Sequence, residues 1–258
     1  MLRGWIASGV EPGRFHVVKP STSGLPLGVH HYRSAAEVGA QFDTVMLGIK
    51  PQKLRALADQ VSGLLLPGGT LISLLGGTRS ASLQRLFTGA HVIRLMPNLA
   101  VEIGKSPLGL WSGMATPSDR SAINTWLSPL GRPVWLSAED QMDALTALAG
   151  SGPAFIYRII DAMAQAGARL GLDPEQSARL ALTMTEGAAA LAAASSVAAD
   201  PQTPAQLAAR VAAPGGMTQA GLDILDNNDM LLQLITATLS ATAQRGAELA
   251  QLTNEDMA

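Results

Sequence analysis

The sequence predicts an α/β domain over residues 1–138, followed by an all-α domain over residues 139–258. Two observations support this. The first half mixes Val, Ile, Leu, Gly and Pro, and its short apolar runs alternate with segments of helical spacing. After about Gln141 the chain becomes rich in Ala, Leu, Met and Gln and has few residues that favour strands. This shift indicates a sheet domain joined to a helical one.

In the first half, strands are expected to alternate with helices. Residues 1–8 fit the end of a helix that stops at Gly9. The expected elements that follow are strands at 15–18, 29–32, 44–49, 70–74 and 91–96, helices at 52–64 and 80–87, and edge strands at 108–111 and 134–136. Gly68-Gly69 is expected to end the helical segment at 52–64 before the strand at 70–74 begins. This order is typical of a doubly wound parallel sheet.

The second half carries clear helix starts. Asp173-Pro174 and Thr203-Pro204 each offer a capping oxygen before a proline in the first turn. The expected helices are residues 144–170, 174–195, 204–211 and 218–252, the last interrupted near Asn227-Asn228. Their Ala-rich surfaces need burial that one small domain does not provide.

Composition narrows the classes of partner. The net charge is −2, so no global field is expected to draw the chain to nucleic acid or to anionic lipid. The apolar run at 187–199 is too short to span a membrane, which favours burial between helices or subunits. The absence of Cys suits a reducing cytoplasm and excludes a thiol nucleophile. The four His residues show no metal-ligand spacing, and no metal site is expected.

One turn carries the strongest chemical signal. Pro214-Gly215-Gly216-Met217-Thr218 lies between a short helix and the next helix. Glycines let the backbone approach a ligand, and free N–H groups of a first helical turn favour an anion. Thr218 is expected to cap the helix or to face the ligand. A plain interhelical turn would explain the glycines alone equally well.

A longer pattern around this turn resembles the signature of the pyrroline-5-carboxylate reductases. The pattern is Pro204-x-x-Leu207-x-x-x-Val211-Ala212-Ala213-Pro214-Gly215-Gly216-x-Thr218-x-x-Gly221-Leu222-x-x-Leu225. Ala213 departs from the Ser or Thr usual in the family. Four further segments resemble the family in the expected order: residues 45–52, 73–77, 92–98 and 149–154.

The resemblance implies roles for individual residues. Thr218 and Glu139 would be catalytic, and the substrate carboxylate would lie at Gly215, Gly216, Met217 and Thr218, with Asn98 beside it. The cofactor would contact Gly48, Ile49, Lys50, Pro51, Leu74, Leu75, Gly76, Ser21 and Thr146. For Glu139 and Lys50, an ordinary surface charge is an open alternative. The reaction implied is reduction of 1-pyrroline-5-carboxylate to L-proline, the last step of proline biosynthesis.

The cofactor expected is NADPH, with NADH as the alternative. A domain that selects NAD usually ends its second strand with an acidic residue. Here the strand at 15–18 is followed by Lys19-Pro20-Ser21-Thr22, whose charge and hydroxyls suit a 2′-phosphate.

The first strand and glycine loop of a dinucleotide-binding domain are missing from this sequence. No strand runs into G-x-G-x-x-G, and Met1-Leu2-Arg3-Gly4 resembles the helix that follows such a loop. The expected domain is therefore Rossmann-like, incomplete at its N-terminus. The hypothesis that follows is a native product that starts upstream, with little reductase activity in the 258-residue form.

Two alternatives are open. The first is a β-hydroxyacid dehydrogenase or a related imine reductase of similar two-domain design. Many of those dehydrogenases use a lysine on the interdomain helix, but no lysine follows Lys105, which argues against the hydroxyacid branch. An inactive truncated paralogue could bind a small carboxylate or serve as a dimerisation module. The resemblance also implies a homodimer or a larger ring.

Overall fold

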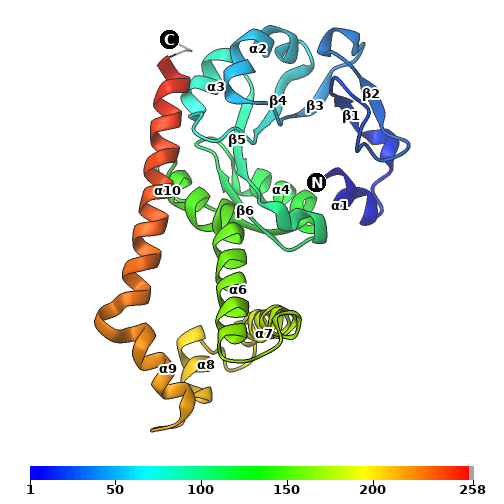
Figure 1. Ribbon diagram of the computed structural model, residues 1–258. Helices are drawn as coiled ribbons and strands as arrows, with labels where there is room; N and C mark the ends of the chain where they lie inside the picture. Colours follow the sequence, from blue (N-terminus) through cyan, green and yellow to red (C-terminus); the bar gives the residue numbers. More distant parts are fainter. Residues whose placement is uncertain (256–258) are drawn as a thin grey trace. The chain divides into compact units, whose positions relative to one another are not determined.

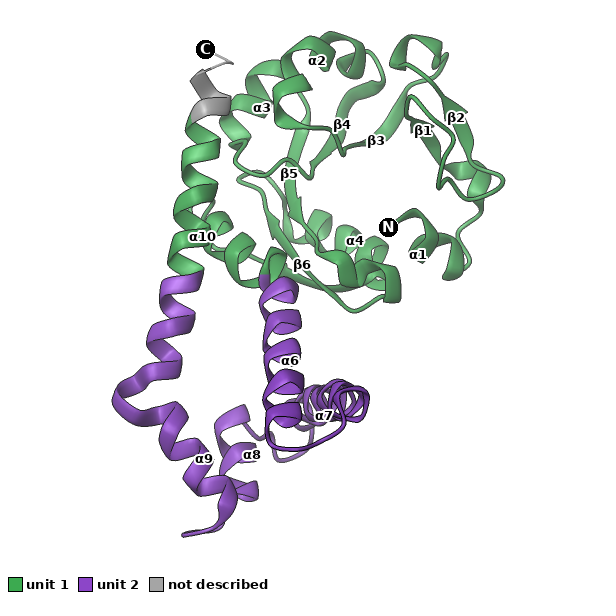
Figure 2. Cartoon of the chain, in the orientation of Figure 1, with its two compact units in different colours: residues 1–151, 239–258 green, residues 152–238 purple. Residues whose placement is uncertain are grey.

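The computed structural model describes the backbone of residues 1–255 and the side chains of residues 1–251. The chain packs as two compact units, residues 1–151 together with the segment from Leu239 onward, and Gly152–Thr238 (Figure 2). These units divide the chain at a different place from the composition-based limit at 138/139. Residues 139–151 belong to the first unit because their side chains pack within it: Met142 and Ala147 are only 2% and 1% exposed.

The first unit carries the strands of the chain (Figure 1). Its elements are α1 (Leu2–Ala7), β1 (His16–Val18), β2 (His30–Tyr32), β3 (Phe42–Leu47), α2 (Leu54–Ser62), β4 (Leu65–Ser73), α3 (Ser80–Leu86), β5 (His91–Met96), β6 (Ser106–Trp111), α4 (Pro117–Leu127), β7 (Gly131–Trp135) and α5 (Gln141–Leu145). Short 3-10 turns lie between several of them, and a π-helical segment, η6 (Thr146–Gly150), follows α5.

Five strands form one sheet in the order β3-β4-β5-β6-β7. All neighbours are parallel except β5 and β6, which pair antiparallel with Leu95 opposite Leu110. The predicted parallel sheet is therefore confirmed for most of its pairs, but its all-parallel form is wrong at β6. The connection over residues 97–105 is too short for a parallel crossover, which needs about a dozen residues or more.

Alternate residues of the central strands feed two cores. Leu71 and Val92 pack on one face with Phe87, whereas Ile72 and Ile93 pack on the other face with Trp5 and Leu127. Both faces are therefore covered, which explains why these strands are almost continuously apolar.

A separate pair of parallel strands, β1 and β2, is not part of the five-stranded sheet. Within residues 1–255, no strand pairs with the outer edge of β3 or with the free edge of β1. The rings of His16 and Phe42, whose centroids are 4.7 Å apart, connect the two sheets at the strand starts. This arrangement fits the prediction of a Rossmann-like sheet without its first strand and glycine loop.

Two local predictions in the first unit need correction. Gly68-Gly69, expected to lie outside a strand, falls inside β4 and produces a shift in its register with β3. Gly68 has φ +75, which glycine adopts without a Cβ penalty. Helix α4 was not predicted, although Thr116 and Asp119 form a capping box at its start.

The second unit is helical, as predicted. Helices α7 (Pro174–Ser195) and α8 (Pro204–Val211) begin at the expected caps, Asp173 and Thr203. The helix expected at 144–170 is instead divided into α5, η6 and α6 (Gly152–Arg169). The long C-terminal helix is interrupted near Asn228, φ +51, as expected, giving α9 (Met217–Asp226), η7 (Asn227–Asp229) and α10 (Met230–Glu255).

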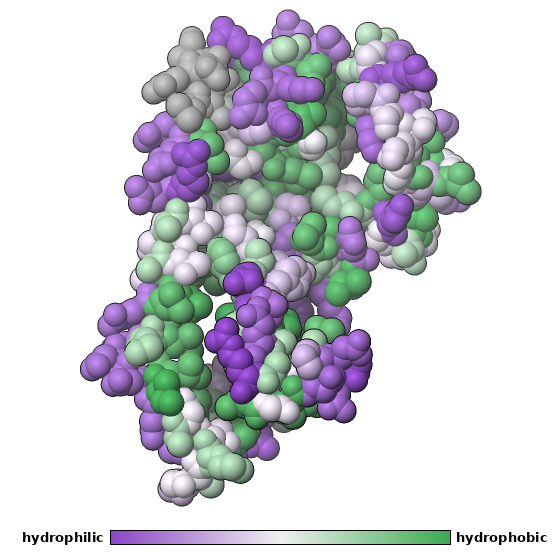
Figure 3. Space-filling model, in the orientation of Figure 1, coloured by the Kyte–Doolittle hydropathy of each residue, from purple (hydrophilic) through white to green (hydrophobic). Residues whose placement is uncertain are grey.

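This helical unit lacks a substantial core of its own. Among its described residues, only Ser177 and Ala181 are buried. Hydrophobic side chains instead reach the surface, as Figure 3 shows for the face in view. Those that are 40% exposed or more include Tyr157, Leu180, Leu191, Leu232 and Leu234. In the part of the chain that is described, none of the helices is both long and apolar enough to cross a membrane.

Candidate active site

One candidate site, within the first unit, is the set of strand ends that the sequence predicts to hold a cofactor. Strands β3, β4 and β5 are parallel, so their carboxyl ends lie at the same edge of the sheet. The amide of Leu74 donates to the carbonyl of Leu47 at 3.0 Å, and Gly48 faces the Leu74 side chain. Gly76 likewise faces the side chain of Met96. The structure therefore brings the three predicted segments together.

Individual residues at this edge differ in what they offer. Gly48, Lys50 and Gly76 are exposed, and Ile49, Pro51 and Leu74 are partly exposed. Leu75 is only 2% exposed and belongs to the core, so only its backbone can meet a ligand. A Cβ added at Gly48 or Gly76 would contact nothing closer than 3.9 Å, which leaves the backbone open there.

Asn98, a predicted substrate contact, has its side chain engaged within the first unit. Its Nδ2 donates to the carbonyl of Ala149 at 2.9 Å, and its Oδ1 accepts from the amide of Ala100 at 2.9 Å. The amide of Asn98 itself donates to Ser106 Oγ at 3.0 Å. Asn98 thus connects the loop after β5 to η6.

Thr146 begins the π-helical segment η6, and its hydroxyl donates to the carbonyl of Met142 at 2.7 Å. At the end of η6, a Cβ added at Gly150 would lie 3.8 Å from the side chain of Met96. The segment that carries Thr146 therefore packs beside the end of β5. Single π-helical turns occur frequently at functional sites.

Ser21 lies outside this cluster. It is exposed in the loop that follows β1, which belongs to the separate two-stranded sheet. Its hydroxyl oxygen accepts from the amide of Ser23 at 3.2 Å, and Lys19 Nζ donates to the carbonyl of Ser23. The loop is thus internally ordered, and it presents the partly exposed Lys19 and the exposed hydroxyl residues Ser21, Thr22 and Ser23.

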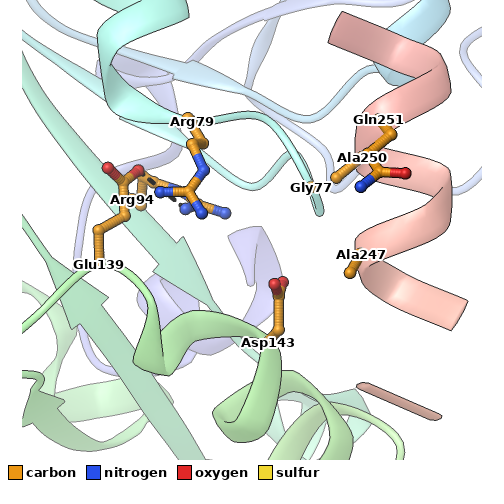
Figure 4. A pocket seen from close by; sticks show the side chains of 8 residues that line it. All are labelled: Gly77, Arg79, Arg94, Glu139, Asp143, Ala247, Ala250 and Gln251. Atoms are coloured by element: carbon orange, nitrogen blue, oxygen red, sulfur yellow. Dashed lines mark hydrogen bonds and ion pairs between the residues drawn. The ribbon is translucent and has the colours of Figure 1, made fainter. Parts of the chain in front are cut away.

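Glu139 is half-buried and fully engaged (Figure 4). Its Oε1 accepts from the amide of Ser80 at 2.7 Å and from Arg94 Nη1 at 2.9 Å, and its Oε2 accepts from Ser80 Oγ at 2.9 Å. Sequence reasoning missed both partners. A lone arginine in the apolar strand at 91–96 was the signal, because a buried guanidinium requires an acceptor.

A separate candidate site is the turn before α9, in the helical unit. Helix α9 begins at Met217, and its N-cap is Gly216 without a side-chain cap, so the expected cap at Thr218 is wrong. The amide of Gly216 donates to the carbonyl of Ala213 at 2.9 Å and is not free for an anion. Gly215 has φ +70, which a residue with a side chain rarely adopts.

The turn still presents donors. Met217 is 96% exposed and Thr218 is exposed. Within the described residues, the amides of Met217, Thr218 and Gln219 make no hydrogen bond. These are the first three helical positions, where free N–H groups favour a negative charge. Gln219 was not predicted, because the expected helix start lay one residue later.

Comparisons with known proteins identify the family. The sequence profile described as pyrroline-5-carboxylate reductase dimerisation matches residues 139–249. A pyrroline-5-carboxylate reductase of Pseudomonas aeruginosa is 36% identical over 220 residues, which are 84% of this chain and 78% of that protein. This chain belongs to the pyrroline-5-carboxylate reductase family.

Solved structures of the family agree with the fold. The structure of a pyrroline-5-carboxylate reductase from Coxiella burnetii has a TM-score of 0.86 and 27% identity, covering 96% of this chain and 93% of that one. A pyrroline carboxylate reductase from Plasmodium falciparum, solved with NADP bound, has a TM-score of 0.81 and 22% identity, covering 96% of this chain and 92% of that one. The second similarity supports the fold alone.

Proposed function

We propose that this chain is an NAD(P)H-dependent oxidoreductase that reduces 1-pyrroline-5-carboxylate to L-proline, the last step of proline biosynthesis. The observation that carries the proposal is membership of the reductase family over most of the chain. NADPH is the proposed donor, on the strength of Lys19 and Ser21 in the loop after β1, and NADH is the alternative to compare.

The cofactor is proposed to lie at the carboxyl ends of β3, β4 and β5. The exposed backbone at residues 48–51 and 74–76 would approach it, since glycines at Gly48 and Gly76 leave room there. Thr146 would face it from η6. When bound, NADPH supplies the hydride, and the protein's part is to hold donor and acceptor in line and to exclude water.

The substrate carboxylate is proposed to lie at the start of α9. The free amides of Met217 and Thr218 would donate to it, and the positive end of the helix dipole would favour its charge. Gly215 and Gly216 would shape the turn. The Thr218 hydroxyl oxygen would accept a hydrogen bond from the N–H of the protonated ring nitrogen. An imine protonated on nitrogen is already electrophilic, so one hydroxyl and an amide cradle suffice.

Glu139 enters the proposal as a positioning residue rather than a proton donor. Its two oxygens already accept three hydrogen bonds, from the amide and hydroxyl of Ser80 and from Arg94. Asn98 would act in the same way, through its bond to Ala149.

Self-association is part of the proposal. The exposed hydrophobic residues of the helical unit need a cover that this chain alone does not supply. A homodimer, or a larger ring built from dimers, would bury them. Sedimentation equilibrium at several concentrations would test this, and a monomer at micromolar concentration would refute it. The absence of Cys supports a cytoplasmic location.

The function is tested by NADPH oxidation with 1-pyrroline-5-carboxylate. Thr218→Val should lower kcat/KM by about a hundredfold, because a buried polar group of the substrate then lacks its partner. Thr203→Ala, which removes a helix cap in the same unit, is the matched control and should leave kcat/KM within about threefold. A wild-type chain that binds proline without oxidising NADPH would instead be a non-catalytic carboxylate-binding module.

A further inference from the structure

The ion pair between Arg94 and Glu139 is unusual because both of its side chains are largely shielded from solvent. The side chain of Arg94 is 5% exposed and that of Glu139 is 15% exposed. Arg94 stands in β5 between Ile93 and Leu95, which are 3% and 0% exposed. A guanidinium does not lose its charge in proteins, so its burial costs several kcal/mol unless acceptors compensate.

Compensation is incomplete. Arg94 Nη1 bonds to Glu139, but Arg94 Nε is buried without a hydrogen-bond partner among the described residues. Replacing a buried ion pair by well-packed apolar residues is often neutral or stabilising. Stability alone therefore does not account for a charge at this position, and its use must lie in the geometry that it imposes.

The geometry is the connection of three separate segments. The Glu139 carboxylate accepts from the amide and the hydroxyl of Ser80, the first residue of α3, and from Arg94 in β5. Ser80 ends the loop that begins with Leu74 after β4. Figure 4 shows Arg94 and Glu139 turned toward each other beside a pocket of about 120 Å³ that Arg79 and Asp143 also line.

These three segments are among those proposed to hold the cofactor: the loop after β4, the end of β5, and the turn that leads into α5 and η6. The fourth, residues 48–51 after β3, is not part of this connection. We propose that Arg94 and Glu139 are a positioning pair that fixes the relative placement of these segments for NADPH. This inference rests on the proposed function. Neither side chain needs to touch the reacting atoms, because a misplacement of about 1 Å at a strand end is enough to lower activity.

The chain contains a matched control. Arg79 Nη1 and Asp140 Oδ1 form an ion pair of 2.8 Å between the same loop and the same turn, one residue away on each side. Their side chains are 57% and 77% exposed. Exposed ion pairs contribute little to stability. Comparing the two pairs therefore tests whether positioning depends on burial and on one carboxylate accepting hydrogen bonds from two segments.

The first test is hydrogen–deuterium exchange of the wild type and of Glu139→Gln, Arg94→Met and Asp140→Asn. Glu139→Gln and Arg94→Met should increase exchange in residues 74–80, 94–100 and 139–150 and leave α7 and α4 unchanged. Asp140→Asn should change none of them. A uniform increase across the chain, or an equal effect of Asp140→Asn, would overturn the proposal. This measurement needs no turnover.

The second test is kinetic. In Glu139→Gln, KM for NADPH should rise at least about tenfold while kcat stays within about threefold, and Arg94→Lys should recover most of the loss of Arg94→Met. A merely structural role would reduce the active fraction, and therefore kcat, without changing KM. If the wild type does not turn over 1-pyrroline-5-carboxylate, the proposed function fails, and the exchange measurement still decides the positioning role.

Discussion

Replacing Asn98 with Ala should lower the free energy of unfolding of the first unit by about 2 kcal/mol. Two hydrogen bonds are lost. The bond from the Ala100 amide to Oδ1 caps a turn, and such caps contribute about 1 kcal/mol. The bond from Nδ2 to the carbonyl of Ala149 is half-buried and contributes about 1 kcal/mol more.

Asn98→Asp separates these two contributions. The carboxylate keeps the acceptor for Ala100 but has no donor for Ala149, so the loss should be about 1 kcal/mol at neutral pH. Urea unfolding followed by tryptophan fluorescence is a suitable assay. Every tryptophan of the chain lies in the first unit, at positions 5, 111, 126 and 135.

With a urea dependence of about 2 kcal/mol per molar, Asn98→Ala should shift the midpoint by about 1 M, and Asn98→Asp by about half as much. The reasoning would be refuted by two results. Shifts below about 0.2 M for both variants would show that neither bond contributes. Equal shifts for Ala and Asp would show that the cap contributes nothing.

Three further outcomes follow from the structure. In urea titrations, Gly77→Ala should lower the free energy of unfolding by about 1–3 kcal/mol, because φ of Gly77 is +73 and an added Cβ would lie 2.9 Å from the Cβ of Ala250. Adding Ala250→Gly should recover only the part of this loss that comes from the contact. Burial lowers the pKa of the His16 imidazole, and the charge of His30 lowers it further. The folded protein should therefore lose stability as the pH falls from the ordinary histidine pKa of 6.5 through the lower pKa of His16 in the folded state. His16→Gln should therefore flatten the stability curve below pH 6.5, and an unchanged slope would contradict this. Thr203→Ala should destabilise α8 by about 1 kcal/mol in thermal unfolding followed by circular dichroism, and no change would argue against the observed cap.

Much of the fold was predictable because its signals are local. The caps at Asp173 and Thr203 and the apolar strand at 91–96 each depend on a few neighbouring residues. Gly68-Gly69 was misread because a local breaker and a bulge within a strand have the same sequence. The direction of β6 depends on the length of a connection, which periodicity alone does not reveal.

The site was predictable in its segments but not in its contacts. The strand ends at Gly48 and Gly76 lie together because parallel topology requires it. The bond from Asn98 to Ala149 spans 51 residues, and the ion pair from Arg94 to Glu139 spans 45. Such separations leave no trace in local pattern. The family resemblance identified Glu139 as important, but only the structure shows that its carboxylate accepts hydrogen bonds from Ser80 and Arg94.

The isolation of β1 and β2 has a thermodynamic consequence. A two-stranded sheet has marginal stability by itself, and Val18, at its end, is 43% exposed. Opening this ribbon should therefore require less free energy than opening the five-stranded sheet. The loop with Lys19 and Ser21 extends from the ribbon, so a nucleotide bound there would have to hold the ribbon closed. Part of the binding energy would be consumed in keeping it closed, and the observed affinity would equal the affinity of the closed form multiplied by the fraction of molecules in which the ribbon is closed.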